Sequence, residues 1–96
     1  MAFTLTLPHP WAKQGWKVKI RDWERVEPPH VTLIRGTDSW RLGLREGRFL
    51  ENNPAPRLVP PQLLKFVLEE QLDLLRREWD HRYPENPVQS EGNDDE

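Results

Sequence analysis

The hydrophobic pattern of this 96-residue chain changes period once, at a proline-rich stretch over residues 52–61. Before that stretch, apolar and polar side chains alternate in three segments, 16–22, 30–35 and 39–45, which is the period of a β-strand with one buried face. After it, leucines recur at intervals of three and four residues, the period of an amphipathic helix. The prolines disfavour both elements within the stretch, so it must carry the chain from a sheet to a helix in an extended form.

This order of elements predicts an α+β fold, with a three- or four-stranded antiparallel sheet packed on one C-terminal helix. Gly36 suits the turn of a hairpin over 30–45, and residues 48–50 would add a short fourth strand. The helix is predicted at about 61–83, because prolines suit its start and Pro84 forces its end. We expect it to be continuous and to bury one stripe, which consists of Leu64, Leu68, Leu72, Leu75 and Trp79, widened by Leu63, Val67 and Leu74.

The length of the chain allows one small domain, which we place at residues 16–87. Residues 1–15 form an N-terminal segment in which 3–7 fit a short edge strand, and 88–96 read as a disordered acidic tail. The chain has no cysteine, which excludes disulfides and thiolate metal sites, and no apolar run of about 20 residues, which a membrane helix needs. A cytoplasmic protein without a cofactor and without a membrane partner is the expectation.

Charge is distributed unevenly over the predicted elements. Residues 1–50 carry nine Lys and Arg against five Asp and Glu, whereas residues 51–96 carry five against eleven. In the alternating segments the polar positions hold cations but no acid, and Gly43 leaves a gap among them. Such a surface would attract an anionic partner, either a nucleic acid or an acidic protein. The predicted binding residues are Lys17, Lys19, Arg21, Arg41 and Arg45.

Two tryptophans, Trp11 and Trp23, lie in polar segments beside cations and outside the predicted core. Aromatic rings beside cations can stack on the bases of single-stranded nucleic acid. The alternative is that each ring covers an open end of a small core, which needs every large apolar group. Both interpretations stay open at this point.

His30 is the residue that fits a catalytic role best. It follows Pro28-Pro29 at the entry of a strand, where nearby cations would keep its imidazole neutral and able to accept a proton. A metal-independent ribonuclease could use such a base, with Arg41 or Arg45 stabilising the phosphate charge. The alternative is a histidine at a strand end without a catalytic role. His9 and His81 have no metal-ligand spacing to it, so no metal site is expected.

The run Glu27-Pro28-Pro29-His30-Val31, followed by Trp40-Arg41, resembles small bacterial domains of unknown function that carry a Pro-Pro-His strand entry. Some of those domains are associated with toxin–antitoxin pairs. Many carry a second histidine two residues after the first, where this chain has Thr32. A third functional alternative is an accessory protein that uses its helix or its open sheet edge for dimerisation or for binding an operon-encoded partner.

Overall fold

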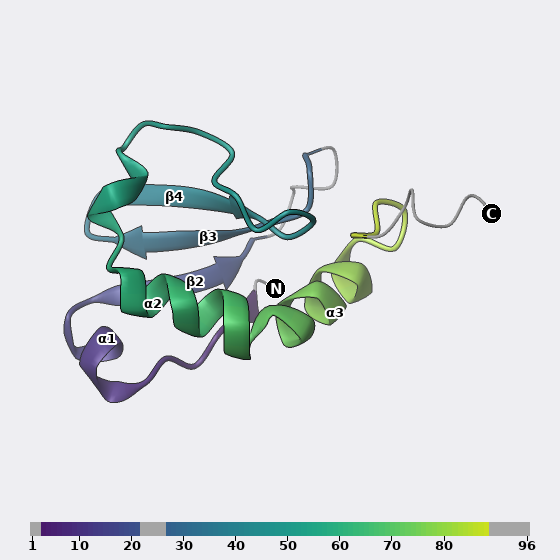
Figure 1. Ribbon diagram of the computed structural model, residues 1–96. Coiled ribbons are helices and arrows are strands. Elements are labelled where there is room, and N and C mark those ends of the chain that lie inside the picture. Colours follow the sequence, from purple (N-terminus) through teal and green to yellow (C-terminus); the bar gives the residue numbers. More distant parts are fainter. Residues whose placement is uncertain (1–2, 22–26, 89–96) are drawn as a thin grey trace.

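The computed structural model describes residues 3–21 and 27–88 and has a four-stranded antiparallel sheet with helices on one side (Figure 1). The strands follow each other in sequence order, each paired with the next. Trp23 and residues 89–96 of the predicted tail lie outside the described residues. The α+β prediction is confirmed, with strands β1 (Phe3–Thr4), β2 (Trp16–Ile20), β3 (His30–Arg35) and β4 (Asp38–Gly43).

The register of the sheet matches the alternation in the sequence. Val18 pairs with Leu33, and Leu33 pairs in turn with Trp40, so that the apolar positions share one face and are buried. Strands β3 and β4 form a tight hairpin in which Arg35 faces Asp38. Gly36 in this turn has a φ of 62°, a conformation that glycine adopts without a steric penalty.

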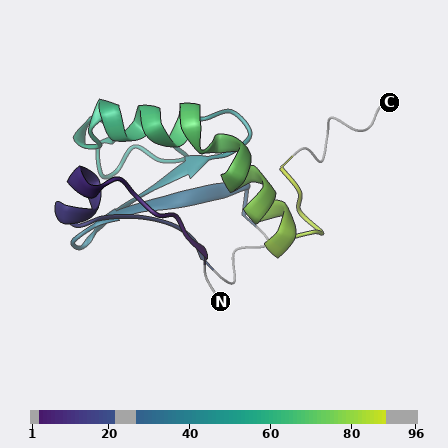
Figure 2. The same cartoon turned by 90° about the horizontal axis from the view of Figure 1, so that it is seen from below.

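The helical half departs from the prediction of one continuous helix over 61–83. It consists of α2 (Pro61–Lys65), a π-helical turn η2 (Phe66–Glu70) and α3 (Leu72–Arg82). Gln71 between them has φ −116° and ψ 0°, outside the helical range. Figure 2 shows that α3 turns away from the direction of α2 and runs past one end of the sheet.

The π turn explains which helical residues are buried. Leu63, Val67, Leu75, Trp79 and Tyr83 are buried and are separated by multiples of four residues, whereas Leu64, Leu68 and Leu72 are only half-buried. Residues four apart drift around an ordinary α-helix of 3.6 residues per turn, and a wider π turn brings them back into line. The predicted centre of the buried stripe was therefore wrong in the first half of the helix, where Leu63 and Val67 are buried in place of Leu64 and Leu68.

Other boundaries shift by a few residues. One helical turn, α1 (His9–Lys13), lies in the N-terminal segment, and a 3₁₀ turn, η1 (Pro56–Leu58), interrupts the proline-rich crossing. Residues 48–50 are not a strand, although Phe49 bridges to Leu42 beside β4. Val88, the first residue of the predicted tail, is buried, so the packed part of the chain reaches at least to this residue. Across residues 3–21 and 27–88, no helix has the length and apolarity needed to cross a membrane.

Candidate anion-binding surface

Strand β2 carries the most regular row of cations in the described sheet. Lys17 and Lys19 alternate with Val18 and Ile20, which are fully buried on the helix side, so the lysines belong to the opposite face. We call that opposite face the outer face. Exposed Arg21 directly follows the strand, and its backbone carbonyl accepts a hydrogen bond from the hydroxyl of Tyr83. The three residues, Lys17, Lys19 and Arg21, are called the β2 row below.

The neighbours of Lys17 and Lys19 on the adjacent strands are uncharged. Lys17 lies opposite Ile34, and Lys19 lies between Thr4 on β1 and Thr32 on β3. Among residues 3–21 and 27–88, no carboxylate forms an ion pair with any member of the row. Alternate residues of a strand are about 6.7 Å apart, so the row presents positive charges at a regular spacing. The structure thus brings together three of the five predicted binding residues.

Arg41 lies on the outer face of β4, opposite Thr32, but its charge is already neutralised. Its guanidinium donates to Glu27 Oε1 at 2.6 Å and also to Glu51 Oε2. The hydrogen bond with Glu51 raises the pKa of Arg41, and the same bond lowers the pKa of Glu51. The prediction that no acid lies on this face was therefore wrong. Both glutamates come from segments outside the strands, where the alternating pattern says nothing about position.

The guanidinium of Arg45 is also hydrogen-bonded within the fold. Strand β4 ends at Gly43, and Arg45 Nε donates to the carbonyl of Val88 at 2.7 Å while its Nη2 donates to that of Pro87 at 2.9 Å. The side chain thereby fastens the end of the packed chain to the end of the sheet. Arg45 is a structural anchor in this arrangement rather than a member of the β2 row.

The sequence predicts a gap at Gly43 among the cations of the outer face. The structure shows that this gap is filled. Its N–H donates to the carbonyl of Arg48 at 2.7 Å, and an added Cβ would lie 3.1 Å from that oxygen and 3.2 Å from Leu50 Cδ2. The returning chain therefore fills the space beside this glycine.

His30 is fully buried, with 0 % of its surface exposed. Its Nδ1 donates to the carbonyl of Pro28 at 2.8 Å, its Nε2 lies 3.8 Å from Glu27 Oε1, and its ring lies 5.5 Å from the ring of Trp79 on α3. A general base must come within hydrogen-bond reach of the proton that it accepts. A fully buried His30 does not come within such reach of a bound substrate, so its geometry does not support the ribonuclease alternative.

Trp11 lies on α1, where it is half-buried and packs against the core. This position fits the interpretation in which the ring closes an open end of the core. Within residues 3–21 and 27–88, no group of three or more metal-binding side chains is assembled.

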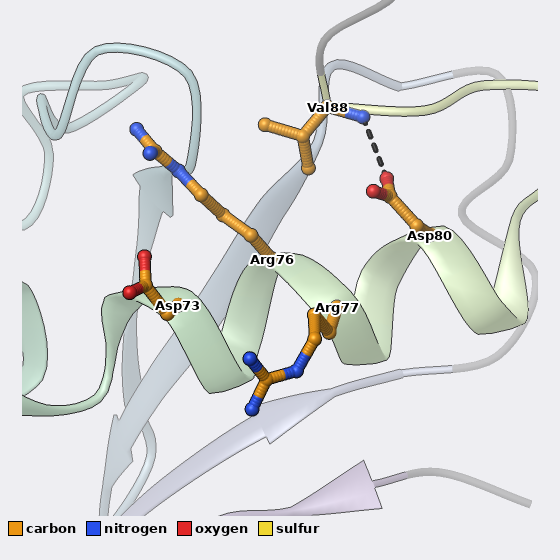
Figure 3. A pocket seen from close by; sticks show the side chains of 5 residues that line it. All are labelled: Asp73, Arg76, Arg77, Asp80 and Val88. Carbon is orange, nitrogen blue, oxygen red and sulfur yellow. Dashed lines mark hydrogen bonds between the residues drawn. The ribbon is translucent and has the colours of Figure 1, made fainter.

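A groove of about 240 Å³ lies between α3 and the segment after it (Figure 3). Asp73, Asp80, Arg76 and Arg77 line it, so charges of both signs meet there. Val88 N–H donates to Asp80 at 2.8 Å, and Arg76 Nε donates to the carbonyl of Leu44 at 2.8 Å. Two of these side chains thus hold the C-terminal segment and the sheet end against α3, and the groove has no excess of either charge.

No protein-family model matches this sequence, and neither a curated protein nor a solved structure matches it. The geometry described above is therefore the basis for a functional proposal.

Proposed function

We propose that this protein is a small binding module that holds a polyanionic partner on the β2 row. The observation that carries the proposal is the placement of Lys17 and Lys19 on β2 and of Arg21 directly after it, with no carboxylate partner among the described residues. Cations that are not already paired can neutralise a ligand's charges and release its counterions. Arg41 and Arg45 do not belong to the proposed binding surface, because their guanidinium groups are hydrogen-bonded within the fold.

The backbone under the β2 row is held on both sides. Strand β2 pairs with β1 and β3, and the full burial of Val18 and Ile20 on the helix side fixes its register, since a slip by one residue would bury the lysines instead. The ligand would thus meet charges whose attachment points are preorganised, while their side chains stay adaptable. A cytoplasmic location, where polyanions are abundant, is part of this proposal.

Binding to a heparin column and to a fluorescent polyanion tests the proposal. Three neutralised charges give a slope of log affinity against log salt of about −2 to −3. The variant Lys17→Glu/Lys19→Glu should elute at markedly lower salt than the wild type. The matched control, Arg57→Glu/Lys65→Glu, changes two exposed cations outside the sheet by the same total charge and should bind much more like the wild type.

Two results would overturn the proposal. One is a Lys17→Glu/Lys19→Glu variant that binds as the wild type does while remaining folded by circular dichroism. The other is an affinity that hardly changes with salt, because apolar interfaces behave in that way and charge-driven ones do not. The latter result would favour an accessory protein that binds its partner through apolar surface.

A further inference from the structure

We infer that the partner is the sugar–phosphate backbone of a nucleic acid, bound lengthwise along β2 without contacts that read the bases. This inference rests on the proposed function and specifies its ligand. It follows from what surrounds the β2 row, from where the aromatic rings lie, and from the charge on the far side of the outer face.

The surroundings of the row favour phosphates over an acidic protein. Stable protein interfaces have an apolar centre with aromatic or other large anchors. On the outer face of the described strands, the positions beside the lysines are Thr4 and Thr32, with half-buried Ile34 as the aliphatic neighbour. Thr32 is buried, so the accessible groups here are the cations and the Thr4 hydroxyl, which suit the phosphate oxygens that make up most protein contacts to nucleic acids.

Within residues 3–21 and 27–88, the tryptophan rings are placed where they do not stack on bases. Trp16, Trp40 and Trp79 are buried in the core, and half-buried Trp11 packs against it. Recognition of unpaired bases usually depends on exposed rings that form a stacking platform. Phosphate contacts alone position a nucleic acid but carry no sequence information. Binding through the β2 row should therefore be independent of sequence.

The negative charge on the β4 side of the outer face favours a ligand that lies parallel to β2. Arg41 is paired with both Glu27 and Glu51, so this cluster carries one net negative charge. It lies two strands away from Lys19, at about 10 Å, which is close to the Debye length at 0.1 M salt. A polyanion that crossed the strands would approach this negative cluster, whereas one that follows β2 meets, among the described residues, the cations of the row.

Fluorescence anisotropy with labelled probes tests the inference. The probes are 12-nucleotide single strands of two unrelated sequences, their duplexes, and a polyglutamate peptide of equal charge. Whether single strands or duplexes bind more tightly, we expect the two sequences to bind with equal affinity in that form. Polyglutamate should bind at least tenfold more weakly. Glu51→Gln should raise nucleic-acid affinity about twofold at low salt, as Coulomb's law gives for one charge at about 10 Å in water. The control Glu70→Gln, an exposed acid in η2, should have a smaller effect.

The outcomes separate this inference from the proposed function. Polyglutamate binding as tightly as nucleic acid, or a tenfold preference for one sequence, would overturn the inference and leave polyanion binding in place. A rise in affinity of Glu51→Gln well above twofold would refute the lengthwise direction, because it would place ligand charge much closer to the cluster than about 10 Å. If none of the probes binds to the folded protein, the proposed function itself is wrong.

Discussion

Replacing His30 by alanine should destabilise the protein strongly. The ring is fully buried at the start of β3, where it lies beside three groups: the Pro28 carbonyl, the Glu27 carboxylate and the Trp79 ring. If the residue served mainly as an accessible catalyst, its removal would change an activity and leave the fold nearly as stable. Its surroundings predict the opposite result.

The size of the effect follows from the contacts that are lost. The hydrogen bond to Pro28 contributes about 0.5–1.5 kcal/mol, and leaving that carbonyl without its donor adds a desolvation cost. The contact with Trp79, whose ring is tilted by 48° to the imidazole, contributes about 0.5–1.5 kcal/mol beyond area burial. With the cavity left behind, the total loss is about 2–4 kcal/mol. A domain of this length has about 5–14 kcal/mol of stability in all.

Thermal and urea unfolding followed by circular dichroism measure this loss. His30→Ala should lower Tm by about 10–25 °C. His30→Asn should recover part of the loss, because its amide can donate to the Pro28 carbonyl although it cannot replace the contact with Trp79. A Tm of His30→Ala within 2 °C of the wild type would refute the assignment of a structural role.

Three further substitutions test other parts of the structure. Thr32→Val should raise the free energy of unfolding by about 1 kcal/mol in urea, because the buried Thr32 hydroxyl has no hydrogen-bond partner within the described residues; a loss of stability would contradict this. Since Arg41 lowers the pKa of Glu51, their pairing stabilises the fold above the ordinary value of 4.5 and is lost as the pH falls through the lowered pKa. The Tm advantage of the wild type over Glu51→Gln should accordingly be present at pH 7 and shrink in acid, and an advantage that grows in acid would show the wrong sign. Arg45→Ala should lower the free energy of unfolding by about 1–2 kcal/mol and should speed amide exchange at Val88. Unchanged exchange at Val88 would contradict this role of Arg45.

Local patterns in the sequence predict much of this fold. The alternation around Val18 and Ile20 predicts both the strand and the face that is buried, because adjacent side chains of a strand point to opposite sides. Pro61 and Pro84 mark the two ends of the helical half, because each proline restricts the backbone at its own position and at the residue before it. Such effects act within a few residues, so the sequence shows them directly.

The π turn at Phe66–Glu70 could not be predicted in the same way. Three- and four-residue intervals fit both a straight helix through Leu64 and Leu68 and a helix with a wide turn that buries Leu63 and Val67. Packing against the curved apolar face of the sheet decides between them. Only the assembled core contains that information.

The sequence by itself determined which residues carry charge and which face of each strand they occupy, because side-chain chemistry and strand alternation are local properties. The tertiary structure decided which of those charges are available to a ligand. Glu27 is 14 positions from Arg41, and Val88 is 43 positions from Arg45, and no periodic pattern links residues at such separations. Their pairing arises when the loops and the C-terminal segment close over the end of the sheet, and it leaves Lys17, Lys19 and Arg21 as the cations on which the proposed function depends.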